Sequence, residues 1–354
     1  MKFNVLEIGS GDAFLIENEG NQLLFDSGGS KSKIKELLKN NRIIDLAICS
    51  HNDSDHSNGL IGLLDDPKFE ILEIWLPGLW VPILNYIIEN DLNADLLHMN
   101  FENETEIERI IERSDETSNY ESLIEKSDIS IENFDDKLQT ISDKIDENLF
   151  HFHFFNFLHS YWYNDEFIKL KRIIKIAGLA YQKGSLIRWF KPENVAPSIM
   201  FPDYNFKSLN AKEIVRIDRV SKINFFKLLH LTNENKYSLV FEYYNDKNPI
   251  ILFSADSDFA FLKNVKKYDN NIIITAPHHG SANNSSVYSK IIGDNIIWVR
   301  SDRKCKKRPC SQFKKLKNKY CLTCNKFLQK EQIKFEYSNM NYHWIYLKGM
   351  SCNC

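Results

Sequence analysis

Short apolar runs and polar turns alternate along the first part of the chain. The runs are rich in Ile, Leu and Phe, and the turns between them are rich in Gly, Asn and Asp, which is the pattern of strands and their connections. The stretch 30–40 differs, because it places Ile34, Leu37 and Leu38 at helical spacing. The predicted elements are strands at 2–8, 13–17, 21–26, 43–49 and 69–76 and helices at 30–40 and 60–64. Strands that alternate with helices predict an α/β fold.

The pattern changes between residues 77 and 219. Residues 100–150 are rich in Glu, Asp, Lys and Ile and poor in Gly and Pro, and residues 149–190 are rich in aromatic side chains. Both compositions favour helices, so this part of the chain is predicted to be a helical insertion. The pattern of the first part then returns, with strands predicted at 223–231, 237–243, 249–253, 271–275 and 296–300 and a helix from Ser286.

One polar loop concentrates side chains that bind metals. The apolar run Leu46–Cys49 predicts a buried strand, and the loop that follows it carries His51, Asp53, Asp55 and His56 within six positions. Imidazole suits zinc, manganese and iron, and carboxylates favour harder ions. The alternative is a solvated polar turn, because Asn, Asp and Ser are common in turns. Two histidines that frame two aspartates favour the metal site.

The loop reads H-x-D-x-D-H and resembles the H-x-H-x-D-H signature of metallo-β-lactamase-fold hydrolases, with Asp53 in place of the second histidine. This variant resembles the β-lactamase-like domain of ComEC-type competence proteins. The opening GSGDAFLI, followed by LLFDSGG, also resembles the start of this fold, in which an aspartate at a strand end orients the metal loop. Asp26 matches that aspartate, and the alternative for it is a helix cap.

Two later motifs support the same resemblance. Strand 249–253 ends in SADSD, where Asp256 matches the aspartate that bridges two metals and Asp258 is the weaker candidate; a helix N-cap is the alternative for either. The run Pro277–Ser281, PHHGS, resembles the last ligand motif of ComEC-type domains. It implies that one of its two histidines, His278 or His279, binds a metal and that the other contacts substrate.

The resemblance implies a four-layer αββα sandwich. Its predicted units are an N-terminal half (1–76), the helical insertion (77–219), a C-terminal half (220–302) and a basic, cysteine-rich tail (303–354). The family has a third histidine at the first metal position, and this chain has no clear match. By position, His230 and His98 are the weak candidates for it.

The resemblance also implies chemistry. Two divalent cations, zinc or manganese, would activate a water and clamp the scissile group. The predicted ligands are His51, Asp53, Asp55, His56, Asp256, His278 and His279, with catalytic roles for Asp55, His56 and Asp26. The implied activity is that of a nuclease or phosphodiesterase. The alternatives are a hydrolase of small molecules (cyclic nucleotides, esters or lactams) and a catalytically weakened binding or regulatory module.

Six of the seven cysteines lie in the tail. Cys321-x-x-Cys324 has the spacing of a zinc knuckle, and structural zinc takes four ligands. Either Cys305 and Cys310, or Cys352 and Cys354, complete the set; separate thiols are the alternative.

Charge is distributed unevenly, although the formal net charge is only −3. Residues 101–150 carry 16 Asp or Glu against 5 Lys or Arg, and residues 303–334 carry 12 Lys or Arg against one Glu. The basic segment agrees with the nucleic-acid substrate that the resemblance implies, although a solvated lysine-rich surface is the alternative. Candidate phosphate contacts are Lys306, Lys307, Arg308, Lys314 and Lys315. The acidic insertion is expected to meet a protein partner or a second copy of the chain.

The location of the protein follows from two further features. No run of 18 or more apolar residues is present, so no membrane contact is expected. The N-terminus passes directly into a predicted strand and lacks a signal-peptide pattern, so a cytoplasmic protein is expected.

Overall fold

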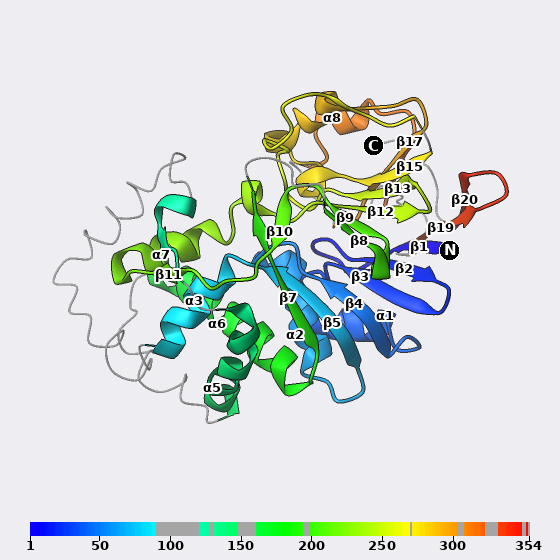
Figure 1. Cartoon of the computed structure of the whole chain (residues 1–354). Helices are drawn as coiled ribbons and strands as arrows, with labels where there is room; N and C mark the ends of the chain where they lie inside the picture. The colour runs from blue at the N-terminus through cyan, green and yellow to red at the C-terminus, as the bar shows by residue number, and fades with distance from the viewer. Residues whose placement is uncertain are drawn as a thin grey trace.

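Two large β-sheets pack face to face, with helices on both outer faces (Figure 1). This computed structural model describes residues 1–89, 120–127, 130–146, 161–193, 199–269, 271–302, 308–322, 332–348 and 352. Within them the chain is the four-layer αββα sandwich of the metallo-β-lactamase fold, as its sequence predicts.

The first sheet has nine strands in the order β10-β7-β5-β4-β3-β2-β1-β19-β20. Strands β3, β4, β5 and β7 are parallel neighbours, so their carboxyl ends meet at one edge of the sheet. The strands are β1 (Lys2–Val5), β2 (Phe14–Asn18), β3 (Asn21–Phe25), β4 (Ile43–Ile48), β5 (Glu70–Pro77), β7 (Leu186–Pro192), β10 (Ala211–Glu213), β19 (Ile333–Ser338) and β20 (His343–Lys348).

The second sheet has seven strands in the order β18-β17-β15-β13-β12-β9-β8. Strands β13, β15, β17 and β18 are parallel neighbours. The strands are β8 (Ile199–Phe201), β9 (Phe206–Ser208), β12 (Phe241–Asn245), β13 (Asn248–Phe253), β15 (Ile272–Thr275), β17 (Ile296–Arg300) and β18 (Lys319–Cys321). Two small pairs, β6 (Ile124–Glu125) with β11 (Arg219–Val220) and β14 (Lys266–Lys267) with β16 (Ile291–Ile292), lie outside the two sheets.

Aromatic side chains fill the space between the sheets. Phe25 of the first sheet stacks on Phe253 of the second with ring centroids 4.3 Å apart, and both rings are buried. Ring pairs of this kind stabilise the structure beyond the area they bury. Strand β13, which ends in one of the polar loops described below, is therefore anchored in this core through Phe253.

Helices cover the outer face of each sheet. Those on the first sheet are α1 (Lys31–Leu37), α2 (Ser54–Leu64), α3 (Trp80–Glu89), α5 (Phe134–Asp146), α6 (Tyr161–Gln182) and α7 (Lys222–Leu231). Those on the second are the short helices α8 (Val287–Lys290) and α9 (Ser311–Lys314). Among the described helices, none combines the length and apolar character that crossing a membrane requires.

The prediction of a purely helical insertion over 77–219 is wrong. Strands β7 and β10 extend the first sheet, and β8 and β9 extend the second. The helix α6 ends before Gly184, which adopts φ +69, and the chain then alternates inward and outward from Leu186. A glycine in the left-handed region commonly ends a helix, and this signal separates β7 from the aromatic helix before it.

The prediction of a separate tail over 303–354 is also wrong in its described part. Strand β18 pairs with β17 in the second sheet, and β19 pairs with β1 in the first. Residues distant in the sequence supply these pairings, so local patterns do not reveal them.

Two predicted strands need correction. Residues 223–231 form the helix α7, because Phe225, Leu228 and Leu229 recur at helical spacing and face the core. Its N-cap, Ser221, accepts a hydrogen bond from Asn224 N. The strand predicted at 237–243 lies instead at β12, Phe241–Asn245.

Candidate metal centre

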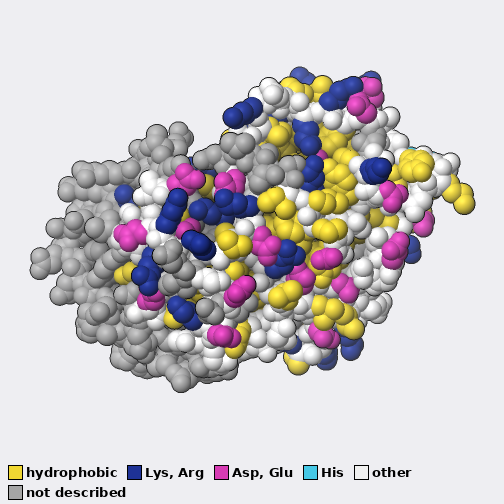
Figure 2. All heavy atoms as spheres, in the orientation of Figure 1, with side chains coloured by type: hydrophobic (Ala, Val, Ile, Leu, Met, Phe, Trp, Pro, Cys, Tyr) yellow, Lys and Arg dark blue, Asp and Glu magenta, His cyan; other side chains and the backbone are white. Residues whose placement is uncertain are grey.

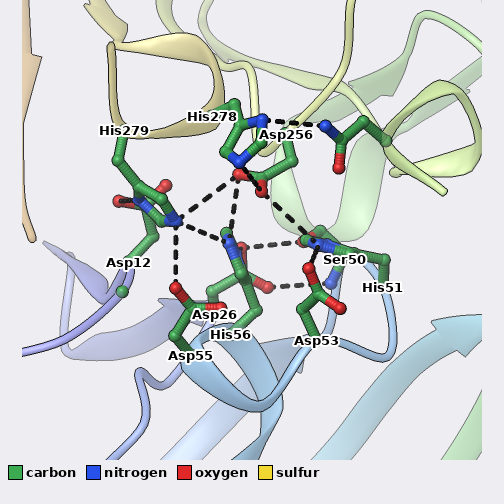
Figure 3. A network of polar contacts seen from close by, with 12 residues as sticks. Asp12, Asp26, Ser50, His51, Asp53, Asp55, His56, Asp256, His278 and His279 are labelled. Carbon is green, nitrogen blue, oxygen red and sulfur yellow. Dashed lines mark hydrogen bonds and ion pairs between the residues drawn. The ribbon is translucent and has the colours of Figure 1, made fainter. Parts of the chain in front are cut away.

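Loops from both sheets converge at one end of the sandwich (Figure 3). His51, Asp53 and Asp55 follow β4, Asp256 follows β13, and the loop with His278 and His279 follows β15. β4 runs parallel to β5 in the first sheet, and β13 and β15 are parallel neighbours in the second. Each loop therefore follows the carboxyl end of a parallel strand, which is where open α/β sheets form ligand sites. The fold thus brings together residues more than 200 positions apart in the sequence.

The donor atoms form two groups that share Asp256. In one group, atoms of Asp12, His56, Asp256 and His279 lie within 4.8 Å of one another; the other group consists of His51, Asp53 and Asp256. Asp256 Oδ1 lies 3.1 Å from His56 Nε2, whereas its Oδ2 lies 3.8 Å from His51 Nε2. Each carboxylate oxygen of Asp256 therefore faces a different group.

Hydrogen bonds on the rear nitrogen of each ring orient the histidines. His56 Nδ1 lies 2.8 Å from Asp26 Oδ2, and His279 Nδ1 lies 3.0 Å from Asp12 Oδ1. Because these carboxylates accept, Nδ1 of each ring carries a proton, and Nε2 is the atom that faces the centre. Ser50 Oγ donates to Asp26 and accepts from His51 Nδ1 at 2.9 Å, so His51 is oriented in the same way.

Asp26 acts behind the centre and belongs to neither donor group. Its Oδ1 accepts from Ser50 N, and its Oδ2 accepts from Ser50 Oγ and His56 Nδ1, all at 2.8 Å. The backbone at Asp26 adopts φ +53, which turns the chain back toward the loop after β4. This position suits orientation of His56 and of the metal loop.

His278 stands at the edge of the second group. Asn284 Nδ2 donates to Asp256 O, which fixes the amide so that Asn284 Oδ1 faces His278 Nδ1 at 3.2 Å. The Nδ1 of His278 also lies 2.8 Å from the side-chain amide of Asn235. His278 Nε2 is 3.6 Å from Asp256 Oδ2 and accepts a hydrogen bond from Arg308.

The two adjacent histidines reach the centre through an unusual backbone. His278 and His279 adopt φ 46 and φ 53, the left-handed region, in which each costs roughly 1–2 kcal/mol. His278 N donates to Ala255 O, and the buried Arg300 donates from Nε to His279 O at 2.7 Å. These bonds hold a strained loop in place, which is common at functional sites.

Charge in the centre is tightly coupled. Burial would raise the pKa of Asp256, but His56 and His279 outweigh it and hold this pKa well below its ordinary value. Burial would lower the pKa of His56, but Asp256 and Asp26 raise it well above 6.5. Burial also opposes protonation of His279, but Asp12 and Asp256 raise its pKa to about 10. The carboxylates therefore attract positive charge to this pocket.

The residues present fit a divalent cation. Within the described part of the chain, His51 Nε2 and Asp256 Oδ1 are buried and make no hydrogen bond. His56 Nε2 and His279 Nε2 lie only 3.2 Å apart. Lone pairs that converge in this way, beside buried carboxylates, are stabilised by a cation. Imidazole with carboxylate is a donor set for zinc or manganese.

Asp53 and Asp55 line the open side of the centre. Their side chains are 32% and 28% exposed, whereas His51, His56 and His279 are buried. Asp55 Oδ2 lies 3.3 Å from His279 Nε2, and Asp53 Oδ2 lies 3.4 Å from His51 Nε2. A substrate that approaches from solvent would meet this side first.

The structure places Asp12 in the candidate metal centre, although the sequence did not predict it, and leaves three weaker candidates unassigned. Asp12 is not among the predicted site residues; its position between two strands, directly after Gly9 and Gly11, is the signal that the sequence offers for it. Asp258, the weaker candidate, instead accepts from Ala260 N. His230 belongs to neither donor group, and His98 lies outside the described residues.

The basic and cysteine candidates are only partly described. Lys306, Lys307, Cys305, Cys324 and Cys354 lie outside the described residues. Arg308 reaches the centre, whereas Lys314 and Lys315 lie exposed at the end of α9. Cys310, Cys321 and Cys352 are buried in the core on the outer face of the second sheet.

Gly11 lets the turn before Asp12 approach the metal loop, and we expect Gly11→Ala to destabilise the protein. A Cβ at Gly11 would lie 1.5 Å from Asp55 O, and φ is +88. Gly9 is a matched control, because it has φ +91 and open space around its Cβ position. In urea denaturation Gly9→Ala should cost about 1 kcal/mol and Gly11→Ala about 3 kcal/mol or more. Equal costs would show that the close approach is unimportant.

Comparison with known proteins agrees with this architecture. Residues 6–80, which include Asp12, Asp26 and the whole His51–His56 loop, match the family model of the metallo-beta-lactamase superfamily. No curated protein matches the chain. The fold is therefore that of the metallo-beta-lactamase superfamily, and the family match together with the buried histidine and aspartate cluster indicates a metal-dependent hydrolase.

Proposed function

We propose that the protein is a metal-dependent hydrolase that cleaves phosphodiesters, with DNA or RNA as its substrate. The observation that carries the proposal is the position of Asp256 between two donor groups. A carboxylate that faces two groups suits a pair of metal ions, and such pairs serve in-line displacement at phosphorus. The likeness of the motifs to ComEC-type domains supports the same class of reaction.

The proposal assigns ligands to two positions. His51, Asp53 and Asp256 hold one ion, and His278 would join them as the third histidine if its Nε2 exchanged the hydrogen bond from Arg308 for the ion. Asp55, His56, His279 and Asp256 hold the other. Asp12 and Asp26 position the rings of His279 and His56. Bound cations supply an activated water and neutralise charge on the scissile group.

Arg308 supports an anionic substrate. Its guanidinium is 26% exposed, and its Nη2 lies 3.1 Å from His278 Nε2 at the edge of the centre. Asp302, at 3.5 Å from Nη1, holds the guanidinium in place. A guanidinium binds phosphate oxygens through paired N–H groups. The proposal therefore places a phosphate of the substrate between Arg308 and the centre.

Further cationic contacts would be local. The amide of Cys310 donates to Gly280 O beside His279, and α9 with the exposed Lys314 begins at the next residue. On the face that Figure 2 shows, Lys and Arg side chains are interspersed with Asp and Glu. Nucleic acid would accordingly be held near the centre by a few cationic groups, and its binding would weaken with salt.

The test is hydrolysis by the purified chain supplied with Mn²⁺ or Zn²⁺. Substrates are single-stranded DNA, duplex DNA, RNA and bis(p-nitrophenyl) phosphate, with a lactam and a carboxylic ester for comparison. We expect cleavage of the phosphodiesters, abolished by His56→Ala and unchanged by the control Asp258→Asn. Arg308→Gln should raise KM for nucleic acid by about tenfold, the effect of losing a charge-assisted contact.

Three results would contradict the proposal. Turnover of the lactam or ester alone would favour the small-molecule alternative. Cleavage that survives His56→Ala would point to a contaminant. Absence of hydrolysis from a chain that binds two ions would favour a binding module on this fold.

A further inference from the structure

Two buried thiols lie together far from the candidate metal centre in sequence. Cys321 ends β18, the edge strand of the second sheet, and Cys352 follows β20 of the first sheet. Their Sγ atoms lie 3.4 Å apart, and both side chains are buried on the outer face of the second sheet. Cys352 N also donates to Lys319 O at 3.0 Å, so a backbone hydrogen bond holds Cys352 against β18.

The two thiols make a hydrogen bond from Cys352 Sγ to Cys321 Sγ, and the distance between the sulfur atoms suits a shared ion better than a covalent bond. A disulfide requires about 2.05 Å between its sulfur atoms. Two thiolates on one tetrahedral zinc, each about 2.3 Å from the ion, lie roughly 3.8 Å apart. The observed 3.4 Å is much closer to the second value.

We propose that Cys321 and Cys352 bind a structural zinc ion. Structural zinc takes four ligands, and the sequence places Cys324 three positions after Cys321 and Cys354 two positions after Cys352. Short spacings of this kind are typical of zinc sites. Of the two sets that the sequence left open, the pairing of Cys321 with Cys352 supports the one without Cys305 and Cys310.

Cys310 lies in the same core but does not join the pair. Burial raises the pKa of Tyr288, and the thiols of Cys310 and Cys321 add to this rise, so the three groups share one region. Among the described residues, however, no three cysteines bring their sulfur atoms within 4.8 Å of one another. The two positions that are assigned here are therefore Cys321 and Cys352 alone.

The ion would join the two sheets. Cys321 opposes Arg300 across the β17–β18 pair, and Arg300 holds the backbone of His279. Cys352 lies beyond the β19–β20 hairpin, which extends the other sheet next to β1. Zinc at this point would close a loop of about 30 residues, and loop closure of this kind stabilises the native state.

The experiment compares metal content in two variants of the full chain, purified with a phosphine reductant and without chelator. We expect Asp256→Asn to retain one zinc per chain by mass spectrometry of the elements. The double variant Cys321→Ser, Cys352→Ser should hold one zinc fewer than the unsubstituted chain, and its melting temperature should be several degrees lower. In cobalt-substituted Asp256→Asn, a sulfur-to-metal charge-transfer band should appear in the near ultraviolet. The band should disappear in the triple variant that combines Asp256→Asn with Cys321→Ser and Cys352→Ser.

A second measurement needs no cysteine variant to fold. Asp256→Asn is titrated with an organic mercurial, and zinc release should follow thiol modification. The proposal would be overturned if purified Asp256→Asn contained no zinc, or if zinc were released without modification of thiols. A Cys321–Cys352 disulfide seen by peptide mapping of the reduced preparation would also overturn it. None of these outcomes depends on whether the chain hydrolyses phosphodiesters.

Discussion

Asp256→Asn is expected to remove both ions from the metal centre and to lower kcat/KM for phosphodiester cleavage by more than about a hundredfold. Asp256 Oδ1 lies 3.1 Å from His56 Nε2 and 3.7 Å from His279 Nε2, and its Oδ2 faces His51 and His278. Asparagine keeps the size of the side chain but replaces one ligand oxygen with an N–H donor and removes the negative charge. One metal position therefore loses its oxygen ligand, and the other keeps only an uncharged amide oxygen, so the binding of both ions is weakened at once.

Two variants make this expectation specific. His51→Ala removes a donor from one group only, so it should lose one ion and retain the other. Asp258→Asn changes a carboxylate two positions away whose Oδ1 accepts from Ala260 N, and it should retain both ions and full activity. Element analysis on the three variants gives the counts. Retention of both ions by Asp256→Asn would disprove the shared-ligand assignment, whatever the activity.

The sequence predicts the fold well where strands and loops follow one another locally. The run Leu46–Cys49 and the loop after it carry their own signals, namely an apolar strand and a dense set of metal-binding side chains. The same holds for the PHHGS loop after β15. These loops converge because the carboxyl ends of parallel strands meet at one edge, which is a property of the fold class.

The parts that the sequence did not predict depend on contacts between distant residues. Strand β19 pairs with β1, more than 300 positions away, and β7 enters the first sheet beside β5 after a long helical segment. Composition misplaced α7, because Ile and Phe favour strands unless their spacing is considered. Pairing partners of this kind are not encoded in any local window.

In the candidate site, the sequence identified residue types better than roles. It left open which histidine of the pair faces a metal, because the answer depends on two successive left-handed residues that turn both rings toward Asp256. It also passed over Asp12, whose contact with His279 spans 267 positions. A carboxylate that orients a histidine has no signature of its own, since any polar turn contains one.

Metal binding is expected to release about one proton per chain at pH 7 and to strengthen as pH rises. In the metal-free protein, burial disfavours the charged ring of His279, but Asp12 and Asp256 raise its pKa to about 10. Asp256 and Asp26 likewise raise the pKa of His56 well above 6.5 despite its burial. The pair of rings therefore keeps a proton between its Nε2 atoms at pH 7, where these atoms lie 3.2 Å apart in a hydrogen bond, and a cation that binds both Nε2 atoms must displace that proton. Calorimetry in buffers of different ionisation enthalpy measures the number.

The stability of the metal-free protein should depend on pH in the opposite direction and should fall as pH rises. A group whose pKa is higher in the folded state than in the unfolded state stabilises the fold fully below its unfolded pKa and loses this effect as pH rises. For His279 the window runs from about 6.5 to about 10, so the melting temperature of the metal-free protein should fall across it. The metal-loaded protein should change less, because bound cations replace the protons.

Asp12→Asn removes the nearest carboxylate from His279 and should move the window to lower pH. A melting temperature that rises between pH 7 and pH 10 in the metal-free protein would contradict this prediction, because it would show that the histidines of the centre are neutral in this range.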